Sequence, residues 1–201
     1  TGIFNAYALA SNGGLVEPLT TSTTDSTFAV SWFPGDNRVL FTADQGGNEL
    51  DHLYVREEDG TTRDLTPGEK VKAGFMGWSK DDKSFHVVTN ERDPAAFDLY
   101  RYATDGYERT LVFRNKDALA IAAVSPDGSK IAMVKPRTSA DSDIYLLDTG
   151  AASAGEAPVT DGQRGRRRSE TGRPYVADHA RTEHPRRQAS RPARRPGSHG
   201  R

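Results

Sequence analysis

The sequence of 201 residues contains no cysteine. This absence excludes a disulfide framework, a thiolate metal site and a cysteine nucleophile. Apolar residues make up only 35% of the chain, so a single large core that includes every residue is not expected. No stretch approaches the roughly 20 consecutive apolar residues that a membrane-spanning helix requires. The sequence therefore predicts no membrane partner.

Large apolar residues are missing from the last quarter of the chain. After Leu147 there is no Leu, Ile, Phe, Met or Trp. Residues 151–201 carry 12 Arg, no Lys and 5 acidic residues, whereas residues 1–150 carry 15 basic and 23 acidic residues. The net charges of the two parts are therefore +7 and −8. A boundary between them is expected near residues 150–163.

The acidic part contains an internal repeat. Trp32, Trp78 and Val124 lie 46 residues apart. Three further sets recur with spacings of 45–47 residues, namely Leu19, Leu65, Leu111; Val39, Phe85, Ile131; and Tyr7, Tyr54, Tyr100, Tyr145. A period that several independent positions share is the signature of repeated supersecondary units.

Each unit is predicted to form short antiparallel strands. Apolar and β-branched runs such as Val39–Thr42 and Ile131–Val134 alternate with the turn segments FPGDNR, SKDDKS and SPDGSK. Pro, Asp and Gly supply the fixed φ, the local hydrogen bonds and the positive φ that tight hairpins need. Four-stranded sheets, about 4–8 of them arranged radially, form a β-propeller. A β-sandwich would account for the strands but not for the constant period.

The predicted fold class is therefore all-β: a partial β-propeller of four-stranded antiparallel blades with a 46-residue repeat, followed by a disordered basic tail. The expected parts are the end of a preceding blade (1–20), three blades (21–66, 67–112 and 113–160) and an Arg- and Pro-rich tail (161–201). Three units cannot close a ring of at least about 4 blades, so we expect a fragment with exposed, aggregation-prone sheet edges.

Three interpretations of the tail remain open. Its basic clusters, GRRRSETGRP and HPRRQASRPARRPGSHGR, are typical of segments that bind phosphate backbones. However, Tyr175 is the only aromatic residue there, so nucleic acid is not an expected partner. A natural disordered tail is the second interpretation. The favoured one is an out-of-frame translation of a GC-rich gene from about residues 162–168 onward, because the repeat stops there.

The turn segment SPDGSKI (Ser125–Ile131) resembles the PD repeat of the periplasmic protein TolB and of peptidases of the prolyl oligopeptidase family. FPGDNRV (Phe33–Val39) and SKDDKSF (Ser79–Phe85) are degenerate copies at the same place in the other units. The segments Leu40–Glu69 and Thr89–Tyr102 resemble the peptidase propellers more closely than TolB. The resemblance covers about residues 3–150.

The resemblance implies a propeller that gates peptide access to an α/β-hydrolase domain with a Ser-Asp-His triad. The serine of that triad lies in a G-x-S-x-G turn, and the sequence has none: GWSKD (Gly77–Asp81) lacks the second Gly and coincides with a repeat turn. We therefore assign no catalytic residue and expect a non-catalytic propeller, with peptide substrates reached through a hydrolase domain absent from this chain. The alternative is a TolB-like periplasmic propeller that binds other proteins. A periplasmic or secreted location is favoured over a cytoplasmic one.

Few residues are candidates for chemistry. His52 and His86 fall in predicted strands, where a structural histidine is expected. The acidic pairs fall at turns, and their spacing does not indicate converging ligands, so neither a metal ion nor a cofactor is expected. Glu91, Arg92 and Asp93 belong to an ERDP loop between two strands. Because loops on a propeller rim often contact substrate or a partner domain, these three are the candidate contact residues.

Overall fold

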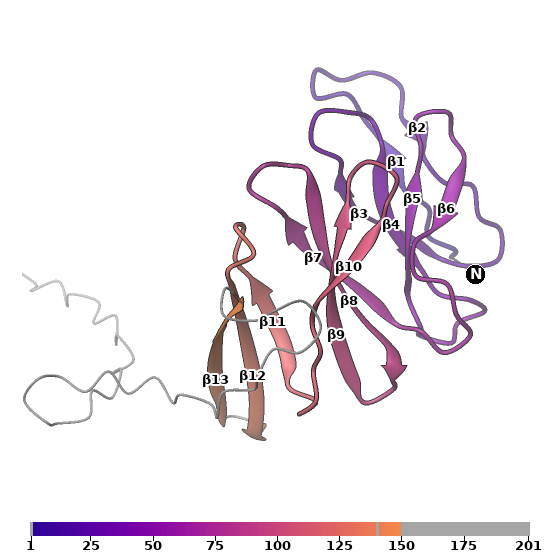
Figure 1. Cartoon of the computed structure of the whole chain (residues 1–201). Helices are drawn as coiled ribbons and strands as arrows, with labels where there is room; N and C mark the ends of the chain where they lie inside the picture. Colours follow the sequence, from indigo (N-terminus) through magenta and orange to yellow (C-terminus); the bar gives the residue numbers. More distant parts are fainter. Residues whose placement is uncertain (1, 140, 150–201) are drawn as a thin grey trace, which may run out of the picture. The chain divides into compact units, whose positions relative to one another are not determined.

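A computed structural model describes residues 2–139 and 141–149. Over these residues the chain forms thirteen β-strands and no α-helix, and therefore no helix that could cross a membrane. Figure 1 shows the strands grouped into successive antiparallel sheets. The predictions about the tail concern residues that lie outside the described ranges.

The described strands form four sheets in chain order. The first pairs β1 (Tyr7–Ala8) with β2 (Glu17–Pro18). The second contains β3 (Thr27–Trp32), β4 (Val39–Ala43), β5 (His52–Arg56) and β6 (Thr62–Asp64). The third contains β7 (Ala73–Trp78), β8 (Ser84–Asp93), β9 (Ala96–Ala103) and β10 (Arg109–Phe113). The fourth contains β11 (Ala120–Val124), β12 (Lys130–Thr138) and β13 (Asp141–Asp148).

Every sheet is an antiparallel meander in which each strand pairs with the next along the chain. The repeat also appears in the position of the β-bulges. The first strand of each larger sheet has one bulge, which lies between Ala29 and Ser31 in β3, between Phe75 and Gly77 in β7, and between Ile121 and Ala123 in β11. These positions are 46 residues apart. Because a bulge increases the local twist, the three first strands are twisted at equivalent positions. The predicted all-β fold of repeated antiparallel units is confirmed, whereas the unit boundaries stay a prediction.

The turns that resemble the PD repeat are closed by hydrogen bonds within the turn. Between β11 and β12, the Ser125 hydroxyl donates to Asp127 Oδ1 (2.6 Å) and accepts from the Lys130 N–H (2.9 Å). Between β7 and β8, the Ser79 hydroxyl donates to Asp81 Oδ1 (2.7 Å) in the same way. Gly128 has φ +68°, a conformation that favours glycine.

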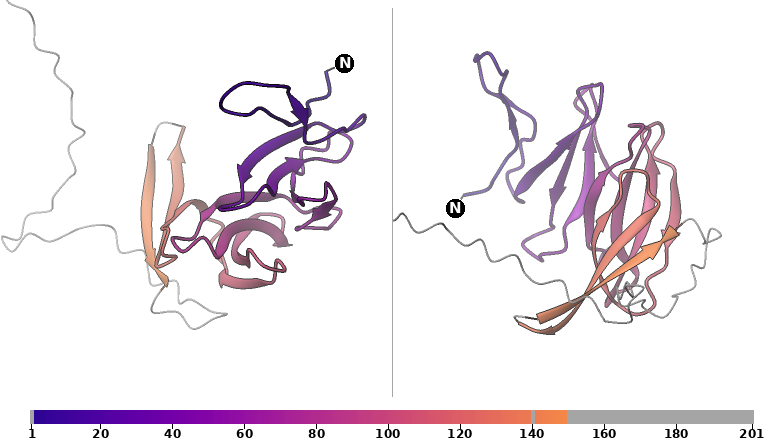
Figure 2. Two further views of the ribbon diagram at one scale, coloured as in Figure 1. Left: turned by 90° about the horizontal axis from the view of Figure 1, so that it is seen from above. Right: turned by 90° about the vertical axis from the view of Figure 1, so that its left-hand side faces the viewer.

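The larger sheets pack face to face (Figure 2). Between the β3–β6 and β7–β10 sheets, Leu40, Leu53 and Val55 pack with an aromatic cluster to which both units contribute. In this cluster the ring of Trp78 packs edge-on against Phe33 and Phe85, with centroids 4.8 and 5.2 Å away. A second core, which includes Leu99, Ile131 and Leu147, joins the β7–β10 and β11–β13 sheets. Polar bonds also cross the first interface, because Trp78 Nε1 donates to Ser31 Oγ (2.9 Å).

Candidate functional site

The predicted contact residues Glu91, Arg92 and Asp93 lie at the end of strand β8, not in a loop. Only Pro94 and Ala95 form the turn to β9, and Asp93 pairs with Ala96 across it. The Asp93 carboxylate accepts a hydrogen bond from the Ala95 N–H (2.9 Å), which closes this turn. The prediction of a loop was wrong. It rested on Asp93 and Pro94, which are turn-forming residues, but these occupy only the tip of a long hairpin.

Arg92 binds other parts of the same sheet. Its guanidinium donates two hydrogen bonds to the Asp98 carboxylate (2.6 and 2.8 Å) and one to the Asn115 carbonyl (2.9 Å). Asp98 is only 1% exposed, and its hydrogen bonds to Arg92 raise the pKa of that guanidinium. Arg92 therefore fastens the hairpin to the segment that follows β10.

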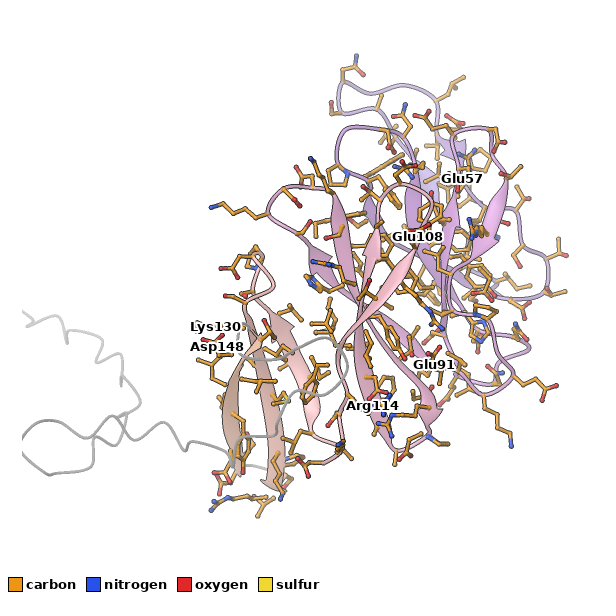
Figure 3. All side chains as sticks on the ribbon, in the orientation of Figure 1. Glu57, Glu91, Glu108, Arg114, Lys130 and Asp148 are labelled. Atoms are coloured by element: carbon orange, nitrogen blue, oxygen red, sulfur yellow. The ribbon has the colours of Figure 1, made fainter. Side chains whose placement is uncertain are left out.

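Glu91 and Asp93 are the more available acidic groups of the hairpin. Glu91 accepts a hydrogen bond from Arg109 (2.7 Å), whose guanidinium lies over the Tyr100 ring. Burial, followed by the hydrogen bond to Glu91, raises the pKa of Tyr100 to about 12. Figure 3 places Glu91 and Glu108 toward opposite ends of the strands of this sheet. Asp93 has the most exposed side chain of the three, and its carboxylate lies 3.9 Å from the Arg92 guanidinium.

A second candidate, which the sequence did not predict, is a cleft between the β7–β10 and β11–β13 sheets. It has a volume of about 440 Å³. Two turns form its walls, Ser79–Asp81 and Pro126–Gly128, and His86 and Arg101 line it from β8 and β9. The Lys80 N–H donates to the Pro126 carbonyl (2.7 Å), which joins the two turns. The turns that identify the repeat in the sequence therefore shape this cleft.

The two histidines of the strands have different surroundings. His52 is buried and its Nδ1 lies 2.8 Å from Asp64 Oδ2, so it is a satisfied structural group, in keeping with the expectation. His86 is also buried, at 3% exposure. Burial, and then the positive charge of Arg101, lower the pKa of the His86 imidazole. His86 is therefore neutral at pH 7 and faces the cleft.

The described residues show neither a metal centre nor a catalytic triad. Within them no three His, Asp or Glu side chains are placed to hold a metal ion. Ser79, Asp81 and His86 share the cleft. However, the Ser79 hydroxyl bonds to Asp81 and to the backbone of Ser84, and no hydrogen bond joins it to His86 in the described structure. A serine without a base is not an activated nucleophile.

Comparisons with known proteins relate this chain to a peptidase. No family model matches the sequence. The chain is 30% identical over 158 residues to the dipeptidyl aminopeptidase BIII of Pseudoxanthomonas mexicana, a match that covers 77% of this chain and 23% of that protein. The chain thus spans about a quarter of the length of the curated relative that it matches.

Solved structures define the fold. The TolB structure from Acinetobacter baumannii matches with a TM-score of 0.50 and 20% identity, over 74% of this chain and 36% of TolB. A putative TolB from Agrobacterium tumefaciens matches with a TM-score of 0.50 and 16% identity, over 74% of this chain and 54% of its own. The described part of this chain is a segment of a β-propeller. A structure from a study of two prolyl endopeptidases matches with a TM-score of 0.54 and 18% identity, over 73% of this chain and 25% of its own. The resemblance of this propeller segment to TolB and to prolyl oligopeptidase family propellers is confirmed.

Proposed function

We propose that this chain is the non-catalytic propeller portion of a serine peptidase of the prolyl oligopeptidase family, and that it gates peptide access to an α/β-hydrolase domain outside this chain. The observation that carries the proposal is the 30% identity to a dipeptidyl aminopeptidase over 158 residues. The sequence has no G-x-S-x-G motif, and Ser79 is held in a repeat turn. The chain by itself is therefore expected to be inactive.

The contact with the hydrolase domain or its peptide substrate is proposed at the tip of the β8–β9 hairpin. Asp93 and Glu91 provide negative charge at this edge, where a basic group of the partner or the free amine of a peptide would bind. Arg92 would act indirectly, because its bonds to Asp98 and Asn115 hold the hairpin in place. The units 21–66, 67–112 and 113–160 are proposed as the blades that carry this edge.

Sequencing the gene downstream of codon 140 is the first test. We expect a reading frame that restores a fourth SPDG-type unit and then reaches a G-x-S-x-G motif followed by Asp and His. The whole protein should then cleave short peptides and spare folded proteins, and removal of the propeller should abolish this size selection. A gene without any hydrolase frame would refute the peptidase proposal.

A TolB-like propeller that binds other proteins and has no enzymatic activity is the second candidate. The match of two TolB structures over 74% of the chain favours it. Its partner would be a protein, and its location periplasmic. Absence of a downstream hydrolase, together with capture of a defined protein partner by the propeller, would establish this alternative. A periplasmic or secreted location is proposed for the peptidase as well.

A further inference from the structure

The cleft beside His86 departs from the repeat that surrounds it. His86 on β8 and Arg101 on β9 are direct cross-strand partners. The same register in the preceding sheet, 46 residues earlier, pairs Leu40 with Val55. Leu40 and Val55 are both fully buried in the core between the sheets. At this position the β7–β10 sheet therefore has a polar pair, whereas the preceding sheet has a pair of core residues. Such departures from the local pattern concentrate at functional sites.

His86 has no hydrogen-bond partner among the described residues and lines the cleft. His86 is 3% exposed, and neither ring nitrogen is bonded to any residue that the structure describes. The ring lies next to Gly128, where a Cβ would be 3.5 Å from Nε2, an ordinary van der Waals distance. Because His86 lines the cleft, its imidazole is available to form a hydrogen bond with a ligand that enters there.

Arg101 is the second group of the cleft that is available to a ligand. It is exposed, and it forms no ion pair within the described part of the chain. Its planar guanidinium presents two parallel N–H donors, which match the two oxygens of a carboxylate. Since His86 lies directly across from it in the sheet, one ligand group could contact both side chains.

The remaining charges of the cleft limit the charge of its ligand. Lys80 adds a positive charge on one wall, and Asp81 and Asp127 add a negative charge on each wall. Hydrogen bonds from Ser125 and Ser129 lower the pKa of Asp127 to about 2, and bonds from Ser79 and Lys83 lower the pKa of Asp81. Both carboxylates are thus ionised at neutral pH. They would repel a multiply charged anion and could accept N–H groups of a ligand.

We propose that this cleft binds a carboxylate group of a small, singly charged ligand, such as the C-terminus of a short peptide, between the Arg101 guanidinium and the His86 imidazole. The volume of about 440 Å³ is within the range of small-molecule sites. The ligand's amide groups would face the two aspartates. This binding site does not depend on a hydrolase domain, so it stands or fails separately from the proposed peptidase function.

The test is a titration of the full chain with N-acetylglycine, followed by NMR of the histidine ring protons. The sequence has 5 His, and the variant His86→Leu identifies the His86 signal. We expect a saturable shift of that signal and a rise of the His86 pKa in the bound state, because the ligand's negative charge favours the imidazolium. The uncharged N-acetylglycine amide serves as the ligand control and should give no saturable shift.

Two variants locate the site. Arg101→Val is expected to weaken N-acetylglycine binding about tenfold or more, since it removes a charge-assisted hydrogen-bond pair. The double variant His86→Leu/Arg101→Val reproduces the Leu40–Val55 pair of the preceding sheet and should abolish binding, measured by isothermal titration calorimetry. Arg114→Val removes an exposed arginine outside the cleft and should bind as the wild type does. If Arg101→Val loses its folded circular dichroism spectrum, the affinity for N-acetylglycine is measured with Arg101→Gln instead.

Three results would overturn the proposal. The first is no saturable shift of the His86 signal in the wild type. The second is unchanged affinity in the folded Arg101 variant. The third is inorganic phosphate binding as tightly as N-acetylglycine, which would show that the cleft does not select a singly charged carboxylate.

Discussion

At the scale of single residues, Thr89 is a buried polar residue whose hydroxyl is not hydrogen-bonded to any described residue. Its side chain is fully buried, and its Oγ1 has no hydrogen-bond partner in the described structure. Thr89→Val keeps the shape and removes the desolvated hydroxyl, so we expect it to raise the free energy of unfolding by about 1 kcal/mol. Thr66 is the matched control: its hydroxyl accepts from the Leu53 N–H (2.9 Å), and Thr66→Val should destabilise the protein in the same urea titration.

His86 gives the fold a pH dependence. The unfolded chain binds a proton at histidine with a pKa of about 6.5, whereas burial and Arg101 lower the pKa of His86 in the folded state. The unfolded state therefore binds more protons, and stability falls as the pH is lowered from about 7 to 5. His86→Leu should remove this part of the decrease. Equal pH slopes for the two proteins in chemical unfolding would contradict the prediction.

At the scale of an element, the β8–β9 hairpin depends on Arg92. Removal of its guanidinium would leave the buried Asp98 carboxylate without its charged partner. A buried charge without a partner lowers the free energy of unfolding strongly. We expect Arg92→Ala to lower the free energy of unfolding by about 2–3 kcal/mol, and the added change Asp98→Asn to recover part of this loss. Asp93→Ala removes only an exposed turn bond and should cost less than about 1 kcal/mol. Similar losses for both single variants would show that Arg92 is not the anchor.

At the scale of the whole molecule, one apolar face of the β11–β13 sheet is covered by none of the described residues. Ile144 and Leu146 are 70% and 63% exposed, and they lie opposite Val134 and Ala132 on β12. In the two preceding sheets, the positions equivalent to Ile144 are Leu53 and Leu99. Both of these side chains are fully buried against the following sheet. Exposed apolar sheet faces promote association, so we expect the full chain to self-associate, and Ile144→Lys/Leu146→Glu to reduce this in sedimentation velocity. Leu15→Ser, at a loop residue, is the control. A wild type that stays monomeric at tens of micromolar would contradict this.

Much of the fold could be predicted because the repeat is written at many positions. The period of 46 residues placed the strands and the turns, since equivalent positions have equivalent neighbours in a stacked array. The β-bulge that recurs with the same period was not predicted, and only the strand pairing shows it. The hairpin at Glu91–Asp93 could not be predicted to the same extent. Turn-forming residues mark where a chain reverses, but the length of the strands before it depends on cross-strand pairing such as Asp93 with Ala96.

The sequence by itself determined that this chain is a repeated, all-β array without cysteine chemistry or a hydrolase motif, because periodicity and composition are properties of the linear chain. The sequence also contained the difference between Leu40 and Val55 in one unit and His86 and Arg101 at the equivalent positions of the next unit. This difference can be recognised only when the units are aligned with one another. Only the tertiary structure decided that this pair opens a cleft. The walls of the cleft come from turns more than 40 residues apart, and burial and the absence of a hydrogen-bond partner arise only when two sheets pack against each other.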